Sequence, residues 1–155
     1  QIEKSGVNLA AIYRPLNNIF LNVIMERIRK KYICKYQIKK GTGGVRELLK
    51  LYKKGHSIAL MIDQRVTQGI KSKFFNEDAF TTTIPAQFVK KFNCKIVPIY
   101  IERFDSINFK IKVEKPIIFS RGVSSEKITR DLNIWLEKMI LKNPGKWIWS
   151  HNRWR

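Results

Sequence analysis

The sequence is short of cysteine and histidine, and each shortage excludes a class of site. Its two cysteines, Cys34 and Cys94, lie sixty positions apart, so they provide neither a zinc cluster nor a disulfide framework. The two histidines, His56 and His151, complete no metal-ligand spacing and no Ser-His-Asp order. We therefore expect no metal and no cofactor, and we expect both thiols in the core of a protein from a reducing compartment.

Long apolar runs are also absent. No stretch approaches the roughly 20 apolar residues that span a bilayer, and the polar, mixed residues 1–9 are unlike a secretory signal. A chain of 155 residues with 44% hydrophobic content is expected to bury one core, as a single domain over residues 1–155. Because it begins with Gln1, we expect a fragment or a processed product, with room for an anchor upstream.

Acidic residues are scarce, with twelve Asp and Glu against thirty-one Lys and Arg, for a formal net charge of +19. Such charge favours nucleic acid, an anionic membrane face or a phosphorylated substrate. The excess is dispersed, since residues 1–50 hold eleven basic and three acidic groups and residues 101–155 hold twelve and six. Frequent Lys, Ile and Asn also share A/T-rich codons, so genome composition is an alternative origin of the charge.

Hydrophobic periodicity predicts an α/β fold. Apolar spacings of three and four predict helices over residues 16–28, 45–52 and 128–139, and Pro85 marks a fourth helix after residues 81–83. Strands are expected over residues 7–13, 32–38, 57–62, 95–102 and 107–113, with a turn at residues 41–44 and a loop over residues 64–75. This alternation predicts a mostly parallel central sheet flanked by helices, with the later strand pair available for antiparallel edge pairing.

Two predicted strand ends carry side chains suited to a site. Pro15 holds Arg14 in extended geometry, and a fixed arginine binds phosphate through two parallel hydrogen bonds. Asp63 closes the apolar run of residues 57–62, and Asp63 with Gln64 could orient a basic group or bind a sugar hydroxyl. Open α/β sheets commonly bind ligands at such strand ends. A surface turn for Arg14 and a strand cap for Asp63 are the structural alternatives.

A third candidate covers residues 71–83, where cations and hydroxyls precede a helix. Lys73, Thr81 and Thr83 are expected to bind an anion with the free amides at the helix N-terminus, although an ordinary capped helix fits the same residues.

The chain ends with tryptophans interleaved with cations. Such a segment can stack on nucleic-acid bases or lie at a lipid headgroup layer. The alternation of Trp147 and Trp149 with smaller residues also fits a plain core strand.

Several motifs follow one another over essentially the whole chain: Tyr13-Arg14-Pro15-Leu16-Asn17-Asn18, Gly44-Val45-Arg46-Glu47-Leu48-Leu49, Asp63-Gln64, Phe74-Phe75, Thr81-Thr82-Thr83, Val97-Pro98-Ile99 and Trp147-Ile148-Trp149-Ser150-His151-Asn152-Arg153-Trp154. Their order and spacing resemble the bacterial lipid A biosynthesis acyltransferases (lauroyl and myristoyl transferases) of the lysophospholipid acyltransferase superfamily. The first and last motifs are the most specific, whereas Asn76 stands where the family commonly has Gly.

The resemblance implies a glycerolipid acyltransferase-like fold and a function in lipopolysaccharide biosynthesis. Such enzymes move an acyl chain from acyl carrier protein onto a hydroxyl of a phosphorylated lipid A precursor, at the cytoplasmic face of the inner membrane. By the same resemblance, Arg14 and Asp63 match motifs that line the acceptor pocket, and the anionic membrane surface is a further partner.

The family's general base, a histidine followed by an acidic residue, precedes the Tyr-Arg-Pro motif, and no histidine precedes Tyr13. We therefore expect the C-terminal part of such an enzyme, N-terminally truncated, without catalytic histidine, membrane anchor or activity of its own. The alternatives are a nucleic-acid-binding module and a peripheral membrane-binding module without catalysis. No nucleic-acid-binding motif occurs, and the dispersed charge also argues against that partner.

Overall fold

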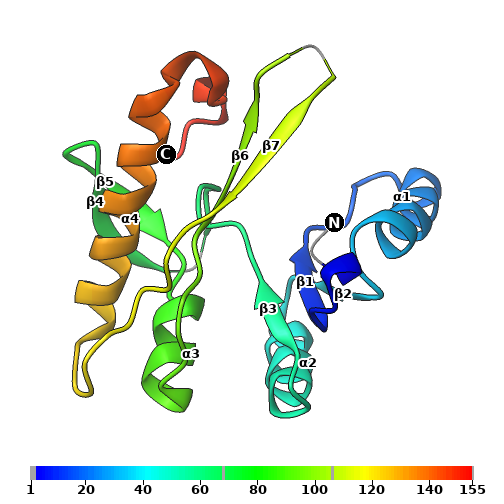
Figure 1. Ribbon diagram of the computed structural model, residues 1–155, viewed down its shortest axis with the longest axis horizontal. Helices are drawn as coiled ribbons and strands as arrows, with labels where there is room; N and C mark the ends of the chain where they lie inside the picture. Colours follow the sequence, from blue (N-terminus) through cyan, green and yellow to red (C-terminus); the bar gives the residue numbers. More distant parts are fainter. Residues whose placement is uncertain (1–2, 68, 106, 155) are drawn as a thin grey trace. The chain divides into compact units, whose positions relative to one another are not determined.

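The computed structural model describes residues 3–67, 69–105 and 107–154 (Figure 1). The chain divides into two compact units, Gln1–Met61 and Ile62–Arg155. Each unit is described by itself, and the single domain expected from the sequence stays a prediction.

The first unit contains a three-stranded parallel sheet in the order β2-β1-β3. Its elements are η1 (Glu3–Ser5), β1 (Leu9–Tyr13), α1 (Ile19–Tyr32), β2 (Tyr36–Lys39), α2 (Thr42–Lys53) and β3 (Ser57–Ala59). Ala10 of β1 pairs with Tyr36 on one side and with Ile58 on the other. Parallel neighbours need crossover connections, and the two helices provide them. The α/β class is confirmed, with a parallel sheet of three strands.

Helix α2 begins at Thr42, so the turn expected over residues 41–44 is wrong beyond Gly41. Gly44 explains how this first turn packs close to the end of β2, because a Cβ at this position would lie 2.3 Å from the backbone oxygen of Lys39. Farther along the helix, Leu48 and Leu51 are buried. Glycine at residue 44 thus permits a close contact between helix and strand that a larger residue would block.

Helix α1 presents its apolar side chains outward. Asn18 caps the helix, accepting a hydrogen bond from the backbone of Leu21 at 3.1 Å. Asn22 and Glu26 are only partly exposed and bond to one another at 2.7 Å. The apolar stripe found by periodicity is exposed throughout: Ile19, Phe20, Val23, Ile24 and Ile28. A polar network, described below, therefore occupies the inner side of this helix.

The second unit begins with a hairpin where the sequence predicted a loop. Strands β4 (Ile70–Phe74) and β5 (Glu77–Thr81) pair antiparallel, with Phe74 opposite Glu77. The two linking residues both have positive φ, 51° at Phe75 and 63° at Asn76. A two-residue turn of this kind matches strand twist and favours Gly or Asn, so Asn76 fills the position where the resemblance expects Gly.

Two helices complete the core of this unit. Helix α3 (Ile84–Phe92) starts with Pro85 in its first turn, as predicted, and helix α4 (Ser125–Lys142) has Ser124 as its N-cap. Figure 1 shows the β4–β5 hairpin beside α4, and contacts between β4 and α4 agree. The buried side chains form two clusters: Phe74, Ala79, Leu136 and Ile140 in one, and Ala86, Val89, Ile128 and Leu132 in the other.

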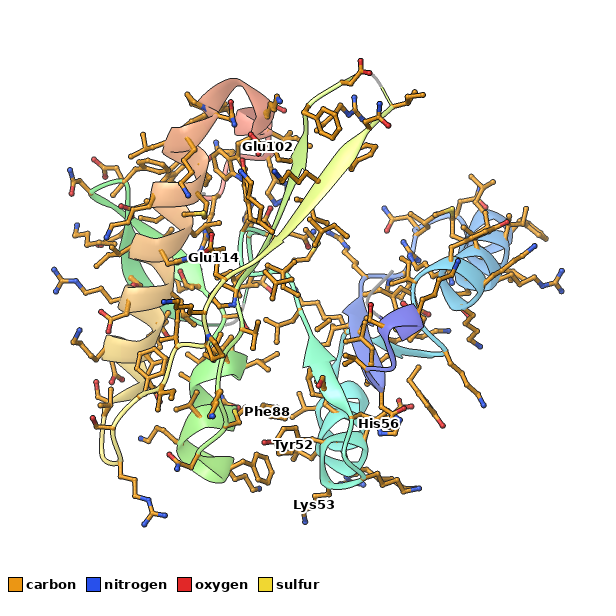
Figure 2. The ribbon with its side chains drawn as sticks, viewed as in Figure 1. Tyr52, Lys53, His56, Phe88, Glu102 and Glu114 are labelled. Carbon is orange, nitrogen blue, oxygen red and sulfur yellow. The ribbon has the colours of Figure 1, made fainter. Side chains whose placement is uncertain are left out.

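Strands β6 (Ile99–Arg103) and β7 (Phe109–Val113) form a separate antiparallel pair. Glu102, labelled in Figure 2, bonds to Lys112 across this pair at 2.7 Å and to Asn143 after α4 at 2.8 Å. The chain ends with two short 3-10 helices, η2 (Pro144–Lys146) and η3 (Trp149–His151). The core strand considered for Trp147 and Trp149 is therefore wrong.

Candidate functional site

Arg153 lies at the centre of a buried polar network in the second unit. Its side chain is completely buried, although it belongs to a polar segment near the end of the chain. Its Nη2 donates to the hydroxyl of Thr81 at 3.2 Å and to Oδ1 of Asn133 at 3.0 Å. These partners come from β5 and α4, so one guanidinium joins three parts of the unit.

Thr81 and Asn133 form further hydrogen bonds within the network. Asn133 also donates to the hydroxyl of Thr81 at 3.2 Å and to the carbonyl of Lys73 at 3.1 Å. The Thr81 hydroxyl in turn donates to the carbonyl of Ala79 at 3.2 Å. A hydroxyl has one donor and two acceptor positions, so that of Thr81 is fully used within this network.

The guanidinium of Arg153 lies over an aromatic ring. The Cζ of Arg153 lies 4.2 Å from the ring centroid of Phe74, a cation–π contact. The rings of Trp147 and Trp154 lie 5.8 and 5.6 Å from the same ring, and the Trp154 indole donates to the carbonyl of Phe74 at 2.9 Å. The tryptophan-rich ending therefore packs around Phe74, the ring that Arg153 overlies.

Burial lowers the pKa of Arg153 to about 10, and the nearby carboxylates of Asp63 and Glu137 counteract this effect. The side chain is thus a cation at neutral pH. Glu137 is itself fixed, since it accepts a hydrogen bond from the Phe75 backbone at 2.8 Å. Arg153 forms no direct ion pair with any residue in the described part of the chain.

Asp63 lies in irregular backbone after β3, which ends at Ala59, so the strand expected through residue 62 is shorter than predicted. Its Oδ1 is buried and has no hydrogen-bond partner among the described residues. Two positions later, the backbone N–H of Arg65 donates to Nε2 of His151 at 3.1 Å. That nitrogen accepts, so the proton of a neutral His151 is on Nδ1.

Arg14, the predicted phosphate ligand, lies in the first unit, exposed directly after β1. Its neighbour Tyr13 donates to Glu26 at 2.6 Å, and Lys39 lies 3.1 Å from the same carboxylate. The hydrogen bond from Tyr13 contributes most to lowering the pKa of Glu26 to about 2, and burial and Glu26 raise the pKa of Tyr13 to about 12. Arg14 thus follows a strand end that is fixed by a polar cluster.

The other predicted residues divide between separate places in the second unit. Gln64 follows Asp63 in the same loop and is exposed. Thr83 directly precedes α3, and its hydroxyl accepts from the Gln87 side chain at 3.0 Å. Lys73 and Thr81 point to opposite faces of the β4–β5 hairpin, because the strand alternates and Thr81 is on the buried side.

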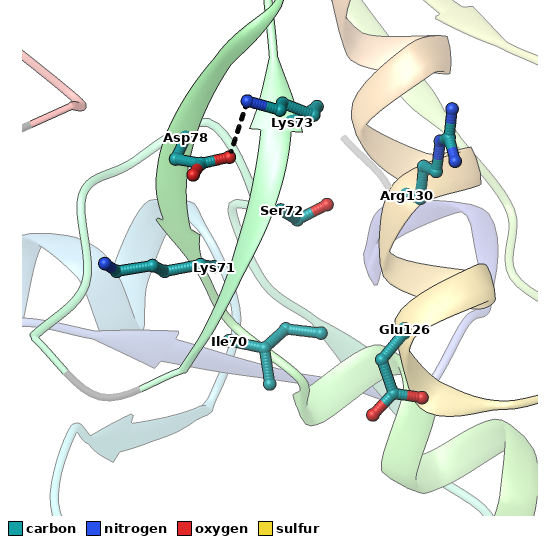
Figure 3. Close-up of a pocket in the computed structure, with 7 residues that line it drawn as sticks. All are labelled: Ile70, Lys71, Ser72, Lys73, Asp78, Glu126 and Arg130. Atoms are coloured by element: carbon teal, nitrogen blue, oxygen red, sulfur yellow. Dashed lines mark ion pairs between the residues drawn. The ribbon is translucent and has the colours of Figure 1, made fainter.

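Lys73 instead lines a pocket of about 420 Å³ between the hairpin and the start of α4 (Figure 3). Its Nζ lies 3.0 Å from Asp78, the ion pair drawn there. Lys71 and Arg130 add two cations to the lining, and Glu126 adds a second carboxylate. The pocket is therefore polar and only slightly cationic. No cluster of side chains suited to a metal occurs in residues 3–67, 69–105 and 107–154.

The comparison with protein families agrees with the resemblance read from the motifs. The family model for bacterial lipid A biosynthesis acyltransferase matches residues 1–155. The chain belongs to this family. The comparison with curated proteins finds no match.

Arg153 belongs to the last of the sequence motifs given above but is not among the candidate site residues predicted from the sequence. The signal that could have found it is a cation between tryptophans: such rings lie partly buried, and a cation among them needs partners for its donors.

Proposed function

We propose that the protein takes part in transferring a fatty acyl chain from acyl carrier protein to a hydroxyl of a phosphorylated lipid A precursor. The observation that carries this proposal is the family match over the whole chain. The reaction needs removal of the acceptor hydroxyl's proton, attack of that oxygen on the thioester carbonyl, and departure of the thiolate.

In this proposal Arg14 binds a phosphate of the acceptor, and Asp63 with Gln64 orients the sugar. The exposure of Arg14 at a fixed strand end supports its role. The buried, unpartnered oxygen of Asp63 supports the second role, because buried polar atoms normally have a partner. Lys73 and Thr83 are further candidates for anion contacts. Thr81, whose hydroxyl is fully used within the buried network, would support the site only through that network.

We place the general-base histidine outside these 155 residues. His56 contacts the carbonyl of Leu51 and stacks edge-on against Tyr36, and His151 accepts from the Arg65 backbone. Neither histidine has a carboxylate partner among the described residues, as a family-type base would. The chain alone is therefore expected to be inactive, and turnover by it would show that the base lies within it.

The net charge of +19 suits an acidic carrier protein, a phosphorylated acceptor and the anionic cytoplasmic face of the inner membrane. Each cation near an anionic membrane contributes about 1 kcal/mol. None of the described helices is long and apolar enough to cross a bilayer. From the excess of cations, we assign attraction to the anionic membrane surface to these residues.

The test uses the enzyme with its upstream region restored. Charged hydrogen bonds contribute about 1.5–3 kcal/mol, so Arg14→Ala is expected to lower kcat/KM for the acceptor by about 10- to 150-fold. Arg27→Ala, which removes an exposed arginine from α1, serves as the matched control. If Arg14→Ala changed kcat/KM for the acceptor by less than a factor of about two, the role of Arg14 would be refuted.

Asp63→Asn is tested in the same way. Asp131→Asn is its control, because Asp131 forms an ion pair with Lys127 within α4. Normal activity of Asp63→Asn at normal expression would reduce Asp63 to a structural residue. A loss confined to Asp63→Asn supports a place in the acceptor pocket.

A further inference from the structure

Two independent observations join the C-terminal segment, residues 147–154, to the loop that carries Asp63. The backbone N–H of Arg65, two residues after Asp63, donates to Nε2 of His151, which lies two residues before Arg153. Arg153 and Asp63 also interact electrostatically as opposite charges. All four residues belong to the second unit, so both interactions lie within one compact unit.

The two side chains have complementary unused groups. Nε and Nη1 of Arg153 are buried donors without a partner, and Oδ1 of Asp63 is a buried acceptor without a partner, among the residues that the structure describes. The Nη2 bonds to Thr81 and Asn133 and the contact with Phe74 hold the guanidinium plane in place. A buried cation fixed on three sides can direct a carboxylate through its field, because interactions are strong in a low-dielectric interior.

We propose that Arg153 is a positioning residue for Asp63, and that the C-terminal segment holds the Asp63 loop in the conformation that acyl transfer needs. The coupling of Arg153 with Asp63 is independent of the proposed function, whereas its importance for transfer rests on that function. Arg153 does not touch substrate in this scheme; it acts through the carboxylate of Asp63.

A double-mutant cycle on the 155-residue chain tests the contact. Urea unfolding is followed by tryptophan fluorescence for Asp63→Asn, Arg153→Met and the double variant. All four tryptophans lie in the second unit, so the signal reports on that unit. We expect the effect of Asp63→Asn on the unfolding equilibrium constant to differ by at least about fivefold between the two backgrounds. Equal effects within about twofold would overturn the inference.

Asp131→Asn with Arg153→Met is the control cycle and is expected to show no coupling, because Asp131 pairs with Lys127. If Arg153→Met does not fold, the cycle is run with Arg153→Gln, whose amide keeps donors towards Thr81 and Asn133 but removes the charge. The same fivefold criterion then decides.

Amide exchange gives a second measurement on the folded chain. His151→Ala is expected to accelerate exchange of the Arg65 amide, whereas His151→Gln, with an oxygen near the position of Nε2, is expected to restore protection. His56→Ala, which alters the other histidine, is expected to leave that amide unchanged. If His151→Ala left the protection of the Arg65 amide unchanged, His151 would not hold the Asp63 loop, and that part of the inference would be overturned.

Transfer by the restored enzyme tests the functional part. A residue that acts through Asp63 gives non-additive losses: Arg153→Gln and Asp63→Asn are each expected to lower transfer, and the double variant no further than the worse single one. Losses that multiply would show a separate structural role and overturn the positioning role. A further outcome is that the cycle shows coupling while Asp63→Asn leaves transfer unchanged. That result would refute the proposed function of Asp63 but would still support the interaction between Arg153 and Asp63.

Discussion

Asn133 is the residue on which the Arg153 network depends most, so Asn133→Leu is the most informative substitution for stability. Leucine has a similar volume but removes three hydrogen bonds, one of them to a cation. Neutral bonds contribute about 0.5–1.5 kcal/mol and bonds to charged groups about 1.5–3 kcal/mol. Since the three share one side chain, we expect a loss of about 3–5 kcal/mol instead of a full sum.

Such a loss is a large part of the roughly 5–15 kcal/mol that stabilises a typical domain. Urea unfolding followed by tryptophan fluorescence measures it directly, because Trp147 and Trp154 lie against Phe74, which Arg153 overlies. With a slope of about 1–3 kcal/mol per molar urea, the midpoint is expected to fall by about 2 M.

The control is Asn108→Leu, because Asn108 is exposed and its side chain bonds to Asp105 at 3.1 Å. That variant is expected to change the free energy of unfolding by less than about 0.5 kcal/mol. If Asn133→Leu lost less than about 1 kcal/mol at an unchanged slope, Asn133 would not hold Arg153, and the network would be a minor contributor to stability.

Three further predictions test local geometry and electrostatics. Asn76→Gly is expected to preserve the stability of the second unit, whereas Asn76→Ala is expected to cost about 1–2 kcal/mol in urea unfolding because φ there is 63°. Gly44→Ala is expected to destabilise the first unit by about 1–3 kcal/mol in amide exchange, because the added Cβ would clash with a backbone oxygen. Gly43→Ala is the control and is expected to be tolerated, because a Cβ there would have no heavy atom within 4 Å. Acidification is expected to destabilise the first unit progressively from about pH 5 to pH 2, because the pKa of Glu26 falls from 4.5 to about 2 on folding, and Glu26→Gln is expected to remove this dependence.

The helices of the second unit could be predicted because their signals are local. Pro85 and Ser124 mark the starts of α3 and α4, and the apolar spacing of α4 matches the buried residues Ile128, Leu132 and Leu136. Each signal acts within a turn or two of the helix that it predicts, so no knowledge of distant contacts was needed.

The β4–β5 hairpin could not be predicted in the same way. Three of the five residues in β4 are Lys71, Ser72 and Lys73, a polar composition that reads as loop. Its turn uses Phe75 at positive φ, a conformation in which a bulky residue is rare. Tertiary contacts with α4 and with the tryptophan-rich ending stabilise this hairpin, and they come from residues sixty or more positions away.

The outward apolar side of α1 shows a second limit. Periodicity finds the apolar stripe but does not say whether the stripe faces the sheet. Here the hydrogen bonds of Glu26 with Tyr13 and Asn22 place the polar side of the helix inward.

Prediction of the candidate site has the same limit. The position of Asp63 after an apolar run is a local signal, whereas its interaction with Arg153, ninety positions later, appears only in the fold.

Because acidic residues are scarce, the surroundings of the Asp63 carboxylate are more informative about its role than the residue type alone. In a chain with thirty-one cations and twelve acids, surface carboxylates readily find partners, as Asp78 and Asp131 do. Asp63 is different, because it is the one carboxylate with a buried, unpartnered oxygen in the described part of the chain. That state costs free energy, since a solvated or paired carboxylate is more stable. This cost motivates the role proposed above for Asp63 in the acceptor pocket, and normal transfer by Asp63→Asn would show that the carboxylate has a structural role instead.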